Sequence, residues 1–243
     1  MFGCCKPDCH FEFKVVNVTL HVTPACIMRK TSYVVTFAVV ALILAFNVIS
    51  TRRPDWLVVK YEEIFHTRVT VTYGLTQRCE LTVSEIPSPS DGGKITYRKY
   101  ECRRFPASVT DGCDKENEAF CAAWTSAGYL AQIGIGFGSV SLLAILVGVS
   151  THSRRRRIWR AVAGLVLLQA ICLLFAFVIV TELYRKESYP TFEHARPGLA
   201  YVLHTISWVV AILTTIGVIT TGISADVGHQ WAAGNRAYQR IGP

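Results

Sequence analysis

The chain has 243 residues, of which 51% are hydrophobic and only 17% charged, and its formal net charge is +8. A soluble domain normally carries about 25% charged residues, so this composition argues against one. The basic residues are dispersed among apolar stretches rather than gathered in one domain, which argues against nucleic-acid binding.

Four apolar stretches dominate the chain, and each is close to the ~20 residues that a helix needs to cross a bilayer. Backbone groups in lipid must be hydrogen-bonded within their own segment, so helices are the expected form. The sequence therefore predicts an all-α membrane protein, built as a four-transmembrane-helix bundle. The predicted transmembrane helices cover residues 33–50, 124–150, 161–182 and 199–223.

The loop at 151–160 sets the expected orientation, because it is short and strongly basic. Short loops rich in Lys and Arg stay on the cytoplasmic side, and such a cluster attracts the anionic lipids of the inner leaflet. The cluster consists of Arg154, Arg155, Arg156, Arg157 and Arg160. We therefore expect an integral protein of the plasma membrane. Its tails (1–32 and 224–243) lie in the cytoplasm, and the loops 51–123 and 183–198 lie outside.

The long loop at 51–123 has the alternation typical of β-strands. In residues 68–73, Val and Tyr alternate with Arg and Thr, which is the period of a half-buried strand. Further β-rich segments lie at 57–61 and 95–99, and a cluster of turn-forming residues occupies 87–93. These features predict a small extracellular antiparallel β-sheet of three or four strands, packed over the outer ends of the helices.

Four cysteines lie in the same loop. Cys79 and Cys102 are nearly equidistant from the turn at 87–93, so a hairpin folded there makes them opposed cross-strand partners within reach of a disulfide. Extracellular conditions allow such a bond to persist. Of the three possible connectivities, sequence separation favours this pair together with Cys113–Cys121. For Cys113 and Cys121 the alternative is free thiols or a bond to a partner.

One tryptophan, a Gly-Leu pair and two cysteines of this loop form a signature, made of Trp56, Gly74, Leu75, Cys79 and Cys102. Together with the four spans, the long first loop and the short basic inner loop, the signature resembles the W…GLW…C…C pattern of the claudin and peripheral-myelin-protein superfamily. The resemblance covers nearly the whole chain. It implies a claudin-like bundle topped by a small sheet.

Three features depart from the animal claudins. Thr76 stands where a second tryptophan is usual, the signature cysteines are farther apart, and Cys113 and Cys121 are additional. In these respects the chain is more similar to the fungal claudin relatives, the eisosome-associated tetraspans and the PalI-type ambient-pH membrane proteins.

Small residues in the second predicted span indicate close helix packing. Gly134 and Gly138 form a small-xxx-small step, which lets two helix backbones approach each other. Packing inside the bundle is the first interpretation, and a lateral dimer face is the alternative. Among the polar residues of the spans, we expect His204 to be a hydrogen-bonded packing residue rather than part of an ion path.

Other cysteines gather near the N-terminus, at Cys4, Cys5, Cys9 and Cys26. Cysteines beside a membrane in a reducing compartment are candidates for reversible palmitoylation. Free thiols are the second interpretation. A metal site is the third, because Cys-Cys-x-x-x-Cys-His lacks the paired spacing of a structural zinc site.

Nothing in the long loop resembles an active site. It has no Cys-x-x-Cys, no His/Glu metal cluster and no Gly-rich phosphate loop, so we expect neither an enzyme nor a bound cofactor. The resemblance implies a structural role in membrane-domain organisation, adhesion or lateral self-assembly, in which the loop binds another copy or another membrane protein. The alternative is an auxiliary subunit that modulates a larger channel, transporter or membrane synthase. A transporter in its own right is a third class.

Overall fold

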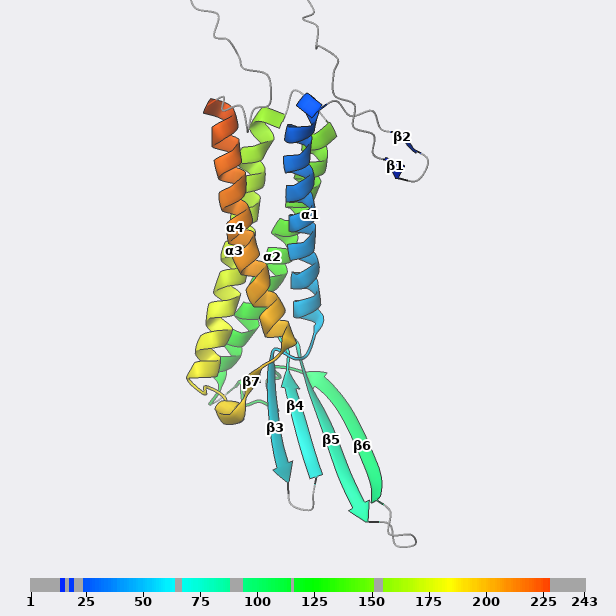
Figure 1. Cartoon of the computed structure of the whole chain (residues 1–243). Helices are drawn as coiled ribbons and strands as arrows, with labels where there is room; N and C mark the ends of the chain where they lie inside the picture. Colours follow the sequence, from blue (N-terminus) through cyan, green and yellow to red (C-terminus); the bar gives the residue numbers. More distant parts are fainter. Residues whose placement is uncertain are drawn as a thin grey trace, which may run out of the picture.

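Four long helices run side by side, and a twisted β-sheet is attached to one end of them (Figure 1). The helices are α1 (Pro24–Arg52), α2 (Glu118–Ser150), α3 (Arg155–Arg185) and α4 (Leu199–Val227). The structure is a computed structural model. It describes residues 14–15, 18–19, 24–63, 67–87, 94–114, 116–150 and 155–227.

Each helix contains a segment that is long and apolar enough to cross a membrane, as predicted. Large apolar side chains cover the outer surfaces of these segments, for example Leu143 and Leu213, each 62% exposed. Such a surface suits hydrocarbon rather than water, and the four helices indicate an integral membrane protein. The segments are Tyr33–Arg52, Glu118–Gly148, Ile158–Arg185 and Leu199–Ser224.

The first two helices begin earlier than predicted, because a helix can continue past its apolar stretch into residues that tolerate helical geometry. α1 begins at Pro24, a residue type favoured in the first helical turn. Cys26 therefore lies on a helix rather than in a tail. α2 begins at Glu118, which makes Cys121 helical rather than part of the loop.

The predicted basic loop at 151–160 is shorter than expected. α3 begins at Arg155, so four of the five arginines lie in its first turns, because arginine is itself a good helix former. These four are Arg155, Arg156, Arg157 and Arg160. Arg154 lies outside the described residues, as do Cys4, Cys5 and Cys9.

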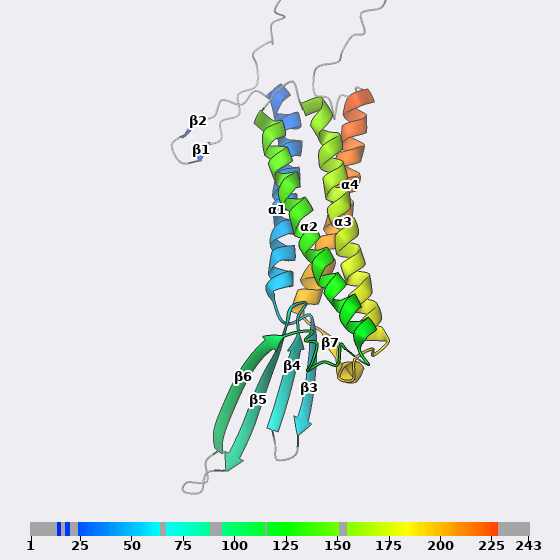
Figure 2. The same cartoon turned by 180° about the vertical axis from the view of Figure 1, so that it is seen from behind.

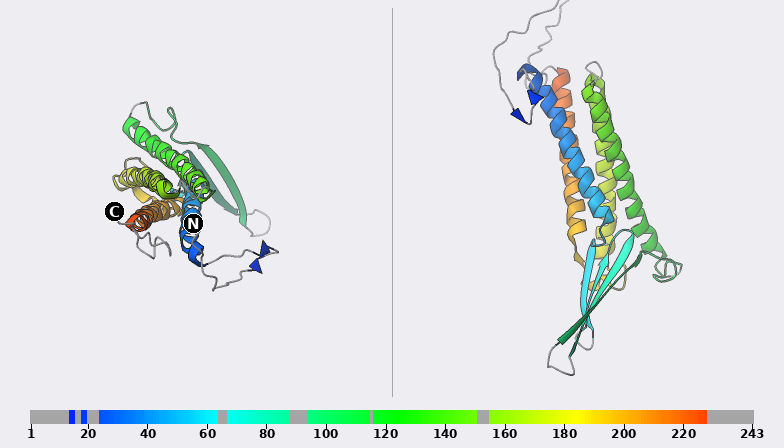
Figure 3. Two further views of the ribbon diagram at one scale, coloured as in Figure 1. Left: turned by 90° about the horizontal axis from the view of Figure 1, so that it is seen from above. Right: turned by 90° about the vertical axis from the view of Figure 1, so that its right-hand side faces the viewer.

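The four helices form a ring in which α1 and α3 each pack against α2 and α4 (Figure 3). Their buried side chains form two apolar clusters along the bundle. Val40 and Ile145 belong to one cluster, and Ile43 and Leu173 to the other. Outside the bundle, β1 (Lys14–Val15) and β2 (Val18–Thr19) pair with each other.

The sheet has five antiparallel strands in the order β6-β5-β4-β3-β7. Four of them lie between α1 and α2, in agreement with the prediction. They are β3 (Leu57–Glu63), β4 (Thr67–Tyr73), β5 (Gln77–Pro87) and β6 (Lys94–Arg104). The fifth strand, β7 (Arg196–Pro197), was not predicted. It follows the short helix η1 (Phe192–His194) in the connection between α3 and α4, so both connections at this end build one sheet.

Residues that oppose each other in antiparallel strands point to the same side, which gives the sheet two faces. One face carries the alternating residues Val69, Val71 and Tyr73, which are buried together with Tyr189 and Phe192 of the α3–α4 connection. We call it the loop face, because this connection packs against it. This burial confirms the alternation predicted for 68–73. The other face carries the opposed pair Cys79 and Cys102, and we call it the disulfide face.

β5 and β6 form the long hairpin that the turn residues predict, and this hairpin extends farthest from the helices (Figure 2). The last pair in its register is Pro87 and Lys94. The turn therefore falls within the predicted cluster, whose residues 88–93 lie outside the described ones.

Candidate functional site

Trp56, the first residue of the predicted signature, joins the helices to the sheet. It is fully buried between α1 and β3. Its indole N–H donates to the Ser50 carbonyl at 2.8 Å, and its ring lies 4.7 Å from the His204 ring on α4. Its backbone N–H donates to the Tyr73 carbonyl at 3.0 Å, and its carbonyl accepts from Gly198 at 2.9 Å. This one residue thus contacts two helices, β4 and the α3–α4 connection.

Gly74 and Leu75 follow β4 in a tight turn. A Cβ on Gly74 would lie 2.7 Å from the Pro54 Cα and 2.9 Å from the Arg53 carbonyl oxygen, so only glycine fits there. The Gly74 carbonyl accepts the indole N–H of Trp124 on α2 at 3.2 Å. Leu75 is buried in an apolar cluster that also contains Trp56 and Trp124. The Gly-Leu pair therefore lets the sheet approach the ends of α1 and α2 closely.

Both predicted disulfides are present in the structure. Cys79 and Cys102 are direct partners in the β5–β6 register, with Cα atoms 4.0 Å apart. Cys113 and Cys121 have Cα atoms 5.7 Å apart, and their bond ties the segment after β6 to the beginning of α2. Among the cysteines whose side chains the structure describes, Cys172 on α3 is free.

Six aromatic rings fill the joint between the sheet, the loops and the helices. Phe105 lies 5.2 Å from Tyr73 and 5.6 Å from Trp124, measured between ring centroids. Phe120 stacks on Tyr189 at 4.9 Å. Aromatic pairs of this kind contribute about 0.5–1.5 kcal/mol beyond their buried area. The rings belong to Tyr73, Phe105, Phe120, Trp124, Tyr189 and Phe192.

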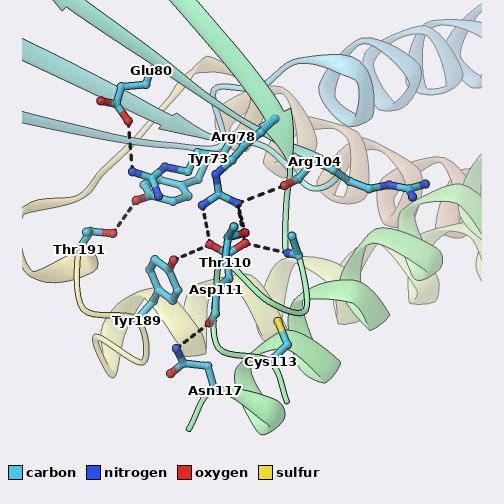
Figure 4. A network of polar contacts seen from close by, with 12 residues as sticks. Tyr73, Arg78, Glu80, Arg104, Thr110, Asp111, Cys113, Asn117, Tyr189 and Thr191 are labelled. Atoms are coloured by element: carbon cyan, nitrogen blue, oxygen red, sulfur yellow. Dashed lines mark hydrogen bonds and ion pairs between the residues drawn. The ribbon is translucent and has the colours of Figure 1, made fainter. Parts of the chain in front are cut away.

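A buried carboxylate lies beside these rings (Figure 4). Asp111 is 3% exposed and accepts two guanidinium N–H bonds from Arg103, at 2.5 and 2.7 Å. It also accepts the Tyr189 hydroxyl at 2.9 Å and the backbone N–H of Ala107 at 2.8 Å. The carboxylate therefore ties β6 and its own loop to the α3–α4 connection.

These contacts set the charge of both partners. Burial raises the pKa of the Asp111 carboxyl, but the hydrogen bonds from Arg103, Ala107 and Tyr189 lower it by more, so this pKa lies below its ordinary value. Burial, followed by the bond to Asp111, raises the pKa of Tyr189 to about 12. At neutral pH the carboxylate is thus ionised and the tyrosine is a neutral donor.

The sequence did not predict this network. Asp111 and Tyr189 are 78 positions apart, and no local pattern connects them. Asp111 precedes Gly112, which has a φ of 66°, so the pair has the composition of an ordinary turn. The one useful signal was the Cys113–Cys121 clip, which marks the segment as rigid rather than as a linker.

Gly134 and Gly138 face α3. A Cβ would lie 3.0 Å from Leu173 Cδ2 at Gly134, and 2.7 Å from Gln169 Nε2 at Gly138. The two glycines therefore serve packing inside the bundle, which is the first of the two predicted interpretations. Among the glycines of α2, Gly136 has open space around it, since an added Cβ there meets nothing within 4 Å.

His204 and Asn47 are fully buried between the helices. The Nε2 of His204 lies 2.9 Å from the Leu173 carbonyl, and the Asn47 amide donates to the Ala131 carbonyl at 3.2 Å. His204 is thus a hydrogen-bonded packing residue, as predicted.

The remaining predicted sites are not gathered into one place. Cys26 lies near the beginning of α1, at the end of the bundle opposite the sheet (Figure 1), and its palmitoylation stays a prediction. Within the ranges that the structure describes, no three His, Cys, Asp or Glu residues are grouped so that they could hold a metal ion.

No protein-family model matches the chain, and no curated protein matches it in sequence. The joint around Trp56 and Asp111 provides a fixed orientation of the sheet on the helices. The surface that this joint holds in place is the sheet itself.

Proposed function

We propose that the protein is a claudin-like integral protein of the plasma membrane. Its function is structural: the exported sheet organises a membrane domain by lateral self-assembly or adhesion. The resemblance is supported by the position of the signature, since Trp56, Gly74 and Leu75 lie together at the joint. In this orientation the arginines at the beginning of α3 face the anionic inner leaflet.

The observation that carries the proposal is the free edge of β6. β6 is the outermost of the five strands, and its 11 residues pair only with β5 in the described sheet. The Cα separation of 4.0 Å between Cys79 and Cys102 is that of a non-hydrogen-bonded pair. Thr96, Arg98 and Tyr100 lie six, four and two positions before Cys102, so they also occupy non-hydrogen-bonded positions opposite β5. Their N–H and C=O groups therefore point to the free edge.

A long free edge is normally a liability, because it offers a row of unpaired backbone groups to any other strand. Here the edge is held rigid by a disulfide at one end and by the Asp111 network beside it. Tyr97 and Tyr100 are 60% and 61% exposed along it. A rigid edge with exposed tyrosines has the properties of a site for strand addition.

An auxiliary subunit is the second candidate, because the same edge can accept a strand of a larger channel, transporter or synthase. The two candidates differ in stoichiometry. Self-assembly predicts oligomers made of this chain alone, whereas an auxiliary role predicts one larger partner in a fixed ratio.

Purification from native membranes in mild detergent, followed by native mass spectrometry, tests the proposal. We expect a series of homo-oligomers from the wild type. Thr96→Pro removes an edge-facing N–H without removing a bond to β5, so it should reduce the series to monomers. Thr96→Val keeps the N–H and should leave the series intact. A monomeric wild type, or a stoichiometric larger partner, would contradict self-assembly.

A further inference from the structure

The two faces of the sheet differ in how their charges are compensated. On the loop face each cation has an acidic partner: Arg78 bonds to Glu80 at 3.4 Å, and Lys99 to Glu101 at 2.8 Å. On the same face Arg103 is held by Asp111. The positive charges of these three residues are therefore compensated by acidic side chains of the same chain.

The disulfide face has cations that lack such partners. Arg98 and Arg104 on β6 and Lys60 on β3 are exposed, and their side chains form no ion pair or hydrogen bond in the part of the chain that the structure describes. In Figure 4 the guanidinium of Arg104 points away from the Asp111 network. Arg68 pairs with Glu62, but both side chains are 73% exposed, so solvent weakens the pair.

The strand register shows how these cations are arranged. Glu62, Arg68, Val83 and Arg98 form one row across β3, β4, β5 and β6, and Lys60, Thr70, Leu81 and Tyr100 form the next row. Strands lie about 4.8 Å apart, so Arg68 and Arg98, which are two strands apart in the first row, are about 10 Å apart. Arg98 and Arg104 are six residues apart on one strand, which corresponds to about 20 Å.

The centre of this face is apolar and small. Leu81 and Val83 are half-buried, and Tyr100 beside them is 61% exposed. A stable protein–protein interface needs about 800 Å² and 20–30 residues on each side, with a larger apolar core than three side chains.

An extended polyanion meets these conditions. Its regularly spaced charges can contact cations that lie about 10 Å apart across the strands and about 20 Å apart along β6. If its units are sugars, their ring faces can also lie on an exposed tyrosine. A second copy of the same face is disfavoured, because the two sets of cations would repel each other.

We propose that the disulfide face binds an extended anionic polysaccharide outside the cell. Arg68, Arg98, Arg104 and Lys60 contact its carboxylate or sulfate groups, and Tyr100 provides the platform for a sugar ring. The inference rests on the proposed function in one respect, the export of the sheet. It gives the adhesive role of the sheet a ligand class.

Binding of a heparin oligosaccharide to the purified full-length protein in mild detergent, at about 0.15 M salt, tests the proposal. The face variant is Arg98→Gln with Arg104→Gln. The matched control is Lys99→Gln with Lys186→Gln, which also removes two positive charges, but from residues that already have acidic partners. We expect at least a tenfold weaker affinity in the face variant and an unchanged affinity in the control. Tyr100→Ala should weaken binding without changing its salt dependence.

Three results would overturn the proposal: no binding by the wild type, equal loss in the face variant and the control, or equally tight binding of poly-L-glutamate. The last result would indicate an acidic polypeptide instead. Thermal unfolding of each variant shows that it is folded. The homo-oligomer series is measured on the same samples, so a failure of polysaccharide binding is distinguishable from a failure of self-assembly.

Discussion

Gly74 determines how closely the sheet approaches the helices. In Gly74→Ala the new Cβ would meet backbone atoms of Arg53 and Pro54, which cannot move without shifting the end of α1. We expect a loss of about 2–3 kcal/mol in the free energy of unfolding, the upper range for overpacking. Thermal unfolding in detergent, followed by tryptophan fluorescence, measures it.

Gly136→Ala is the control, because its Cβ meets nothing within 4 Å. Alanine is a better helix former than glycine, so this variant should unfold at the same temperature as the wild type or slightly higher. Equal behaviour of the two variants would show that the approach at Gly74 does not limit the fold.

Asp111 should make the stability of the joint depend on pH. Its pKa is lower in the folded protein than in the unfolded chain, so its contribution is complete above the ordinary aspartate pKa of ~3.9. The contribution is lost as the pH falls through the folded-state pKa. The wild type should therefore lose unfolding free energy below about pH 4.

Asp111→Asn isolates this carboxylate from the others. The Arg103 side chain is 36% exposed, so we expect a loss of about 2 kcal/mol at pH 7, less than for a fully buried pair. Because the variant cannot titrate at this position, the difference from the wild type should shrink as the pH falls below about 4. Parallel pH profiles in thermal unfolding would contradict the assigned role.

At the scale of elements, the β5–β6 hairpin depends on its cross-strand disulfide. Replacing both cysteines, Cys79→Ser with Cys102→Ser, should cost about 3 kcal/mol, because the unfolded chain loses a constraint on the loop that the bond closes. Chymotrypsin should then cleave the hairpin faster, at exposed residues such as Tyr97 and Tyr100. The double variant Cys113→Ser with Cys121→Ser is the control and should keep a resistant hairpin. Wild-type resistance without the first disulfide would show that the hairpin does not depend on this bond.

The elements that the sequence predicts are those with a local cause. The alternation at 68–73 and the position of two cysteines about one turn were enough to predict β4 and the hairpin. β7 has only two residues, and they form a strand only because β3 lies beside them. The Asp111 network depends in the same way on contacts between distant segments, so no local pattern in the sequence predicts either feature.

In the whole molecule, the long connection between α1 and α2 and the short connection between α3 and α4 form one rigid unit. The hydroxyls of Tyr73 and Thr191 lie 2.6 Å apart, Asp111 bonds to Tyr189, and β7 completes the sheet. The sheet therefore has a fixed orientation on the bundle, with the disulfide face opposite the face that makes these contacts. Both proposed interactions depend on this rigid presentation and on the proposed location of the sheet outside the cell.

The most direct test of both proposals is to determine on which side of the membrane the sheet lies. Thr96→Cys is placed in a chain whose cysteines outside the two disulfides are changed to alanine, and intact cells are treated with a membrane-impermeant maleimide. A tag at the C-terminus serves as the internal control. If the sheet is exported, this cysteine is labelled on intact cells, and the tag is detected only after permeabilisation. Labelling of the cysteine only after permeabilisation would place the sheet inside the cell and would rule out both proposed interactions.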